Sequence, residues 1–280
     1  VHLRSSINDP YSLSDNAIYS LCKDREDGIW IGSYFGGVNY YPRFYTYFEK
    51  YYPKGTDNGL RGKRVREFCQ DNQGILWIGT EDGGLNRFNP KTKTFSFFTP
   101  SSAFTNVHGL CLIGDHLWVG TFSKGVKVVD TRTGAIVKTY QKTDSPRSLI
   151  DNSVFSICCT TTGDIYLGTL FGLLRYNKQS DDFDRIPNGR FVYDIKEDSG
   201  GNLWLATYAN GAYCYNVSEK KWKNYLHDKN NPKSLPYDKV LSIFEDSHRQ
   251  IWLTTQGGGF CRFQPDTETF ANYNLSAGLP

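Results

Sequence analysis

The chain has 280 residues, 32 of them basic and 29 acidic, and this net charge of +3 is too balanced to indicate a nucleic-acid-binding protein by itself. Charged residues make up 22% and aromatic residues 15%, which excludes a disordered chain, and no apolar run approaches the ~18 residues of a membrane span. Methionine is absent and position 1 is valine, so we expect a piece of a longer protein.

A segment of five residues recurs along the chain. It first occurs as Ile29-Trp30-Ile31-Gly32-Ser33, and each of its six copies has an aromatic landmark residue at the second position. The landmarks are Trp30, Trp77, Trp118, Tyr166, Trp204 and Trp252. Their spacings of 47, 41, 48, 38 and 48 residues average 44.4, and a period of this length indicates a repeat architecture.

The elements of each repeat follow a constant order. A short apolar strand such as 18–21 comes first, and an Asp six residues before the landmark, such as Asp24, then begins a turn with Gly28. Asp and Gly between two strands predict a hairpin. The landmark strand, a Gly-Gly pair, a third strand and a fourth strand ending in aromatic residues complete the repeat, for example at 45–48, 95–98 and 222–225.

The landmark strand is apolar on both faces, because Ile29 and Ile31 alternate with Trp30 and Gly32. A strand buried on both sides without helices lies between two other sheets, so the fold class is all-β, a β-propeller of four-stranded antiparallel blades. Six complete repeats are visible, and we expect them to be part of a seven-bladed propeller. We expect blades at 14–52, 60–99, 104–141, 150–186, 190–226 and 237–274, with an outer strand and loop of a preceding blade at 1–13 and a lead-in to the next blade at 275–280.

The seven cysteines and five histidines do not form a metal site in the sequence. Four cysteines lie seven or eight residues before a landmark, so we interpret them as packed hydrophobic residues in separate sheets. No Cys-x-x-Cys pair or zinc-ligand spacing is present, and the Asp-rich turns lack the Glu that closes an EF-hand calcium loop. We expect no cofactor and no metal.

The repeat resembles that of the two-component regulator propeller family. The pattern Ser/Asn-x-x-Ile-x-Ser-Ile-x-x-Asp-x-x-Gly-x-Leu-Trp-Ile-Gly-Thr-x-x-Gly-Gly-Leu is matched closely at 16–38 and 64–85, and well at 152–173, 190–212 and 238–260. Residues 107–126 depart most, since Gly114-Asp115-His116 replaces the Asp-Gly turn. The resemblance implies the extracytoplasmic, periplasmic sensor region of a hybrid histidine kinase that detects glycan breakdown products, with the kinase in other domains of the same polypeptide.

Candidate ligand-binding residues lie in two sets of loops, which meet on one face of a propeller. Aromatic side chains suit sugar rings, Asn, Glu and Gln suit hydroxyls, and the basic run at 61–66 suits a carboxylate or sulfate. The candidates are Tyr34, Phe35, Arg61, Lys63, Arg64, Arg66, Glu81, Asp82, Phe122, Lys124, Phe171, Arg190, Tyr208, Asn210, Tyr237, Lys239 and Gln256. The alternatives are that the aromatic residues pack between blades and that the charges are merely solvated.

Three functions remain open at this point. The first is a non-catalytic sensor that binds an oligosaccharide, with no nucleic acid partner and no direct membrane contact in this segment. The second is a scaffold for protein contacts or a homodimer, which an apolar patch on a blade edge would favour. The third is a lyase or hydrolase, which requires His, Tyr or paired carboxylates at the axial face. Known catalytic motifs are absent, so we expect no enzyme in this chain.

Overall fold

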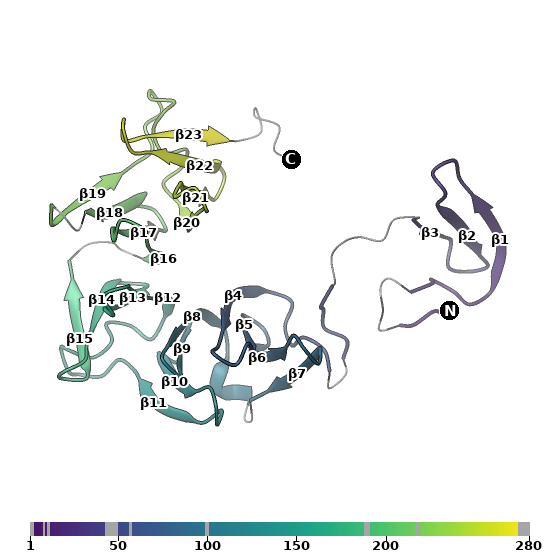
Figure 1. Cartoon of the computed structure of the whole chain (residues 1–280), viewed down its shortest axis with the longest axis horizontal. Coiled ribbons are helices and arrows are strands. Elements are labelled where there is room, and N and C mark those ends of the chain that lie inside the picture. Colours follow the sequence, from purple (N-terminus) through teal and green to yellow (C-terminus); the bar gives the residue numbers. More distant parts are fainter. Residues whose placement is uncertain are drawn as a thin grey trace. The chain divides into compact units, whose positions relative to one another are not determined.

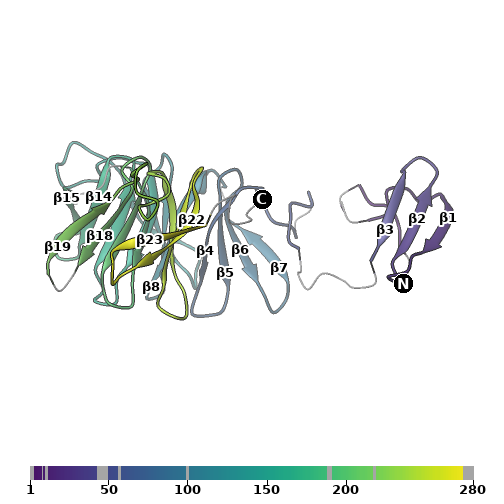
Figure 2. The same cartoon turned by 90° about the horizontal axis from the view of Figure 1, so that it is seen from above.

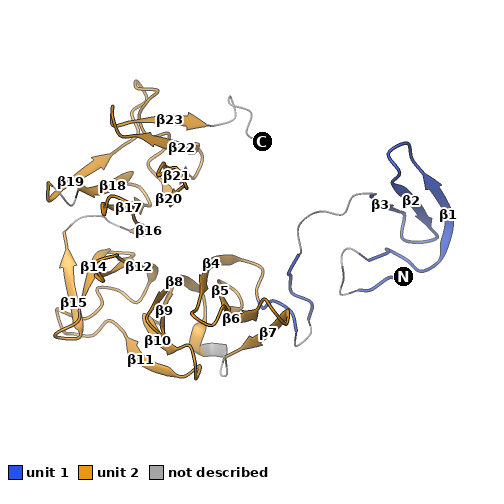
Figure 3. Cartoon of the chain, viewed as in Figure 1, with its two compact units in different colours: residues 1–61 blue, residues 62–280 orange. Residues whose placement is uncertain are grey.

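The computed structural model describes residues 3–7, 9, 12–42, 50–55, 58–98, 101–187, 191–216 and 219–273, without the side chains of 101 and 102. The chain divides into two compact units, residues 1–61 (unit 1) and residues 62–280 (unit 2), shown in Figure 3. Unit 1 contains a three-stranded sheet of β1 (Ile18–Lys23), β2 (Ile29–Ser33) and β3 (Val38–Tyr41). The fourth strand expected at 45–48 lies outside the described residues, as does the lead-in at 275–280.

Unit 2 contains five four-stranded sheets, in which consecutive strands pair antiparallel. The strands are β4 (Val65–Gln70), β5 (Leu76–Thr80), β6 (Gly84–Asn89), β7 (Thr94–Phe97), β8 (Val107–Ile113), β9 (His116–Thr121), β10 (Val126–Asp130), β11 (Ile136–Tyr140), β12 (Val154–Cys159), β13 (Ile165–Thr169), β14 (Gly172–Asn177), β15 (Asp182–Ile186), β16 (Val192–Glu197), β17 (Leu203–Thr207), β18 (Ala212–Asn216), β19 (Lys221–Tyr225), β20 (Val240–Glu245), β21 (Ile251–Thr255), β22 (Gly259–Gln264) and β23 (Thr269–Tyr273). A short 3₁₀ helix, η1 (Ser101–Phe104), precedes β8.

The sheets of unit 2 are propeller blades. Their first strands, β4, β8, β12, β16 and β20, follow one another along the inner side of an arc and contact their neighbours (Figure 1). We call these the inner strands. Figure 2 shows that the strands run between two opposite faces of the unit. The prediction of an all-β fold with blade-like sheets is therefore confirmed.

A carboxylate and a tryptophan link the hairpin turn to the core of each regular blade. Trp77 donates its indole N–H to Asp71 Oδ2 at 2.8 Å. Asp71 Oδ1 accepts the backbone N–H groups of Gln73 and Ile75 at 2.9 and 3.0 Å, so one side chain closes the turn and satisfies the indole. The same tryptophan–aspartate bond joins Trp30 to Asp24, Trp204 to Asp198 and Trp252 to Asp246.

The hydroxyl residue at the end of each landmark strand holds the loop that follows. Thr80 Oγ1 donates to the carbonyl of Gly84 at 3.0 Å and accepts the N–H of Gly83 at 3.1 Å. Five other repeats have the same hydroxyl-to-carbonyl bond, made by Ser33, Thr121, Thr169, Thr207 and Thr255. The loop between the second and third strands is thereby fixed to its blade.

The core of unit 2 lies between neighbouring sheets. Trp77 is 0% exposed and Trp204 is 2% exposed. The Trp204 ring centroid lies 4.9 Å from that of Phe263, which belongs to the next blade. Trp30 differs, with 44% exposure, because unit 1 contains only one described sheet, in which Tyr40 packs against the ring at 4.6 Å between centroids. The expectation that landmarks are buried between blades therefore holds at Trp77 and Trp204.

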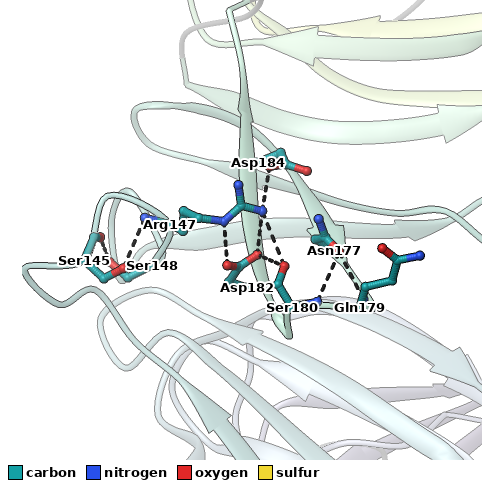
Figure 4. A network of polar contacts seen from close by, with 8 residues as sticks. All are labelled: Ser145, Arg147, Ser148, Asn177, Gln179, Ser180, Asp182 and Asp184. Atoms are coloured by element: carbon teal, nitrogen blue, oxygen red, sulfur yellow. Dashed lines mark hydrogen bonds and ion pairs between the residues drawn. The ribbon is translucent and has the colours of Figure 1, made fainter.

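A long connection reinforces the free edge of β15 (Figure 4). Ser148 Oγ accepts the N–H of Thr143 at 3.0 Å, and Leu149 beside it is buried. The Arg147 carbonyl accepts the N–H of Phe183 at 2.9 Å, while its guanidinium binds Asp182 at 2.5 and 2.8 Å and Asp184 at 2.9 Å. The sequence Pro-x-Ser-Leu, which recurs at 232–235, marks this edge-covering connection.

The seven cysteines are free thiols. Cys214 and Cys261 are buried, and burial raises the pKa of each thiol to about 12. Cys22 is exposed, in contrast to the expectation of packed cysteines, because it lies in the single sheet of unit 1. Within the described ranges, no cluster of three His, Cys, Asp or Glu residues could hold a metal ion. No helix in the described part of the chain has the length and apolar character to cross a membrane.

Candidate functional site

Every inner strand of unit 2 begins with a β-bulge. In β4, for example, Val65 pairs with Thr80 and Glu67 with Gly79, so that Arg66 is the extra residue. A bulge re-aims one side chain and is common beside binding sites. The bulge residues are Arg66, His108, Phe155, Tyr193 and Leu241. Contacts between Arg66 and both His108 and Tyr193 place this end of the inner strands around a common centre.

The loops predicted to bind ligand lie beside these bulges. In each blade, the first loop residue after the landmark strand donates its backbone N–H to the carbonyl of the residue two positions before the bulge, at 2.9–3.2 Å. The pairs are Glu81 with Arg64, Phe122 with Asn106, Leu170 with Ser153, Tyr208 with Phe191 and Gln256 with Lys239. We call the surface formed by the bulge residues and these pairs the axial face.

Three nearly parallel aromatic rings, called the ladder below, lie together on the axial face, and the centroids of Tyr193 and Tyr208 are 6.0 Å apart. The ring of Tyr208 stacks on that of Phe191 with a centroid distance of 4.8 Å and an angle of 9°. Phe191 stacks on Tyr193 at 4.9 Å and 14°. Lys239 Nζ lies 3.7 Å from the Tyr208 centroid at one end, and the Arg66 guanidinium lies 6.0 Å from the Tyr193 centroid at the other. The rings come from one blade, whereas the two cations come from others.

A second aromatic group adjoins the ladder. Phe155 contacts Phe191 at 4.8 Å and His108 at 4.9 Å between ring centroids. Phe122 lies 5.9 Å from Phe155 and is 43% exposed. Phe171 is also exposed, so Phe122 and Phe171 offer open ring faces beside the ladder. Phe155 itself is buried and packs against the rings of His108 and Phe122.

The basic segment predicted to bind anions is partly neutralised by its own blade. Arg64 and Arg66 both lie 3.4 Å from carboxylate oxygens of Glu81. Asp82 accepts the backbone N–H groups of Lys63 and Arg64, and these bonds lower its pKa. Glu81 and Asp82 therefore hold the basic segment in place, a role that differs from the predicted contact with ligand hydroxyls.

Two carboxylates lie just below the bulges. Glu67 and Asp194 occupy the position where β12 and β20 carry Ser156 and Ser242. Asp194 accepts hydrogen bonds from Ser242 Oγ at 3.0 Å and from the N–H of Ile243 at 2.9 Å, so it bridges β16 and β20. Burial raises the pKa of both carboxyls, and that of Glu67 reaches about 7.

His108 is held as a neutral side chain. Burial, assisted by the charge of Arg66, lowers its pKa to about 4. Arg66 Nη2 lies 3.2 Å from His108 Nδ1, and Asn106 Oδ1 lies 2.9 Å from Nε2. Because Arg66 can only donate, we assign Nδ1 as the acceptor and Nε2 as the protonated nitrogen. Both nitrogens are thus occupied, which disfavours a role as general base.

The remaining predicted residues are dispersed. Tyr34 and Phe35 belong to unit 1, where Tyr34 stacks on Tyr19 at 4.8 Å. Arg61 is the last residue of that unit, and Arg190 lies outside the described residues. Tyr237 is exposed near Lys239 in the chain. The rest of the set, Lys124, Asn210 and Gln256, lies on the loops after the landmark strands.

Sequence reasoning identified Arg66 but missed the other four bulge residues and Phe191. Their signal was present in the sequence, because in these four repeats a large residue precedes a Gly, Ser or Asp of the inner strand, as Phe155 precedes Ser156. Its identity changes from copy to copy, which is typical of a binding position on a constant scaffold. Periodicity alone does not reveal the bulge that turns this side chain toward the axis.

A separate groove of about 950 Å³ lies between the last two blades, lined by the turns at the opposite ends of the strands from the axial face. Its charged residues largely stabilise the blades. Lys223 pairs with Glu268, and Glu245 accepts the N–H of Ser199 at 2.9 Å. The axial face gathers side chains from all five blades, and we therefore take it as the candidate site.

Comparisons with known proteins agree with this fold. The family profile described as Two component regulator propeller matches residues 12–35, 59–82 and 186–209. Histidine kinase P4 of Formosa agariphila is 27% identical over 174 residues, which are 58% of this chain and 12% of that protein.

Solved structures share the architecture at low identity. The extracellular domain of BT3049 from B. thetaiotaomicron, assigned to the hybrid two component systems, has a TM-score of 0.62 and 22% identity, over 99% of this chain and 43% of that chain. Virginiamycin B lyase from Staphylococcus aureus, in a catalytically inactive form with quinupristin, has a TM-score of 0.58 and 14% identity, over 95% and 86%. Three of the repeats thus match the profile of the two component regulator propeller, and the blade fold is similar to that of solved propeller domains.

Proposed function

We propose that this chain is the ligand-binding part of an extracytoplasmic sensor in a two-component signalling protein, whose kinase lies in other domains. The observation that carries the proposal is the axial face, where Arg66, Phe155, Tyr193, Tyr208 and Lys239 converge from four blades. The matches to the family profile and the similarity to a histidine kinase support the signalling role. An oligosaccharide is the proposed ligand class.

The chemistry of the axial face supports this ligand class. The open rings of Phe122 and Phe171 are suited to the apolar faces of sugars, and Asn210 and Gln256 are suited to their hydroxyls. The chain spans only 12% of the histidine kinase it matches, so coupling to a kinase is part of the proposal.

Calorimetric titration of the protein with a panel of neutral and acidic oligosaccharides tests the proposal. We expect binding that Phe171→Ala weakens, because Phe171 offers an open ring. Lys221→Ala in the groove on the opposite face serves as the control and should bind as the unmodified chain does. Absence of binding across the panel would refute direct oligosaccharide sensing.

An apolar surface that the other sheets of unit 2 leave open favours a second candidate, a scaffold for protein contact or a homodimer. Phe68 in β4 is 57% exposed, whereas its counterparts in the other four blades, Leu110, Ile157, Ile195 and Ile243, are buried. No sheet of unit 2 precedes β4, which explains the exposure. Sedimentation analysis of the unmodified chain and Phe68→Ser tests this candidate, which predicts an association that the substitution removes.

A lyase is disfavoured on chemical grounds, although the axial face contains a His, two Tyr residues and two carboxylates. Both nitrogens of His108 are occupied, and Asp194 is committed to Ser242 and Ile243. Glu67, with a pKa of about 7, is the group best suited to proton transfer. Chromatography of oligosaccharides incubated with the protein should detect no cleavage product.

A further inference from the structure

Lys239 has an unusual position on the axial face. Its ammonium lies 3.7 Å from the Tyr208 centroid, whereas the other lysine and arginine contacts with rings in the described part of the chain are at 5.3–6.0 Å. Lys239 precedes β20, and Tyr208 follows β17, so the contact joins two blades. The ammonium therefore covers the outer face of a ring that would otherwise be open.

The ladder leaves little ring face for a sugar. Phe191 stacks on Tyr208 at 4.8 Å, and Tyr193 packs against Phe191 beside Tyr208, with its centroid 6.0 Å from that of Tyr208. Tyr208 is nevertheless 40% exposed, so what it presents is its edge and hydroxyl. Ring edges carry positive potential, and a hydroxyl donates a hydrogen bond. In this state the end of the ladder attracts an anionic group and has no free face for a neutral ring.

The charge of Lys239 is also uncompensated. Arg64 and Arg66 pair with Glu81, but Lys239 forms no ion pair with any described carboxylate. Its sequence neighbour Asp238 is engaged instead, since it accepts the N–H of His227 at 2.7 Å. Lys239 is thus a partly buried cation held by a ring alone, and a carboxylate or sulfate would be a stronger partner for it.

We propose that Lys239 selects acidic sugars: its ammonium moves from Tyr208 to a carboxylate or sulfate of the ligand, and the uncovered ring receives the sugar. The inference rests on the proposed function and specifies its substrate class. A neutral sugar must displace the ammonium without offering a charge in exchange. When the ammonium leaves Tyr208 for the anion, the ring becomes free for the sugar, so binding of the anion and stacking of the sugar are coupled.

Calorimetry with matched trisaccharides of galacturonic acid and galactose tests the selectivity. We expect the acidic trisaccharide to bind about tenfold more tightly, and Lys239→Gln to remove that preference. Lys221→Gln, at an exposed cation in the groove on the opposite face, is the control and should retain it. Equal binding of the two trisaccharides by the unmodified chain would overturn the selectivity while leaving oligosaccharide sensing intact.

An NMR measurement tests the ammonium exchange without relying on sugar binding. We expect the ε-methylene protons of Lys239 to resonate upfield of those of other lysines, since the Tyr208 ring shields them, and Tyr208→Leu should abolish this shift. Sodium sulfate should move the signal downfield, whereas sodium chloride at equal ionic strength should not. An ordinary ε-methylene shift in the free protein, or equal responses to the two salts, would overturn the proposal.

Discussion

The carboxylate of Asp71 serves two structural needs, because one oxygen caps the hairpin turn and the other accepts the indole N–H of Trp77. A buried indole without an acceptor would carry a desolvation cost, and an Asp-Gly turn without its cap would be looser. The shared carboxylate explains why Asp and Trp recur six residues apart. In the sheet of β8 to β11, a tight Gly114-Asp115 turn replaces the loop, and Trp118 stacks on Tyr140 at 5.4 Å, much as Trp204 stacks on Tyr225 at 5.8 Å.

Truncation of the landmark should reveal the packing between blades. Trp77→Ala should lower the free energy of unfolding by about 3–5 kcal/mol, because it leaves a large cavity at a fully buried site. Trp30→Ala is the matched control and should cost clearly less, since that ring is 44% exposed. Urea denaturation followed by circular dichroism measures both. A cost below about 1 kcal/mol at Trp77 would contradict the register of the blades.

The raised pKa of Glu67 predicts a pH-dependent stability. Its folded-state pKa of about 7 lies above the ordinary value of 4.5. Between pH 4.5 and pH 7, the folded chain therefore keeps the carboxyl proton that the unfolded chain has lost. The stabilisation is complete below about pH 4.5 and is lost as the pH rises through 7. Glu67→Gln should match the unmodified chain at pH 5 and exceed its unfolding free energy by about 1–2 kcal/mol at pH 8, after allowance for partial exposure.

Denaturant titrations of both chains from pH 5 to pH 8 measure this difference. Glu26→Gln, at an exposed residue of unit 1, should show no such trend and serves as the control. The lowered pKa of His108 makes the unfolding free energy decrease at acid pH. Because His108 is present in all the chains, its contribution cancels when their unfolding free energies are compared. A difference independent of pH would contradict the burial of the Glu67 carboxyl.

Among the elements, the long connections show how an edge strand is protected. The fourth strand of a blade has an unpaired edge, which favours aggregation unless it is covered. The connection at 141–153 covers β15 through the Arg147 carbonyl and through the ion pairs of its guanidinium (Figure 4). The connection at 227–239 covers β23 through the carbonyl of Lys233, which accepts the N–H of Phe270 at 2.7 Å.

A pair of matched substitutions separates the contribution of the ion pairs from that of the backbone hydrogen bond. Arg147→Met should cost about 1 kcal/mol of unfolding free energy, because it removes partly exposed ion pairs with Asp182 and Asp184 but keeps the backbone bond. Lys233→Met, at the corresponding place, should cost close to nothing. Thermal denaturation of the two variants measures this contrast. Equal costs would mean that the ion pairs contribute nothing to the edge.

The strands could be predicted from the sequence because the same pattern of apolar, aspartate and glycine residues recurs in each repeat. The landmark strand, its hydroxyl residue and the Asp turn all lie where the repeats place them. The bulges could not be predicted, because one extra residue in β12 changes the direction of Phe155 without changing the apolar pattern. The contact of Lys239 with Tyr208 was equally hidden, since it depends on the packing of two blades.

For the molecule as a whole, the axial face is the feature that differs from blade to blade on a constant frame. Turns, landmarks and hydroxyl residues repeat, whereas the bulge positions carry Arg66, His108, Phe155, Tyr193 and Leu241. A rigid scaffold with one varied face is the arrangement expected of a binding protein. We propose that the ligand is selected by the cations and rings of that face rather than by the groove between the last two blades.

The most direct test of the central claim is calorimetric titration of the galacturonic acid trisaccharide into three forms of the protein. The account predicts saturable binding to the unmodified chain, binding weakened about tenfold in Tyr208→Ala, and unchanged binding in Lys221→Ala on the opposite face. Binding that Lys221→Ala abolishes and Tyr208→Ala leaves intact would place the ligand in the groove between blades and contradict the assignment of the axial face.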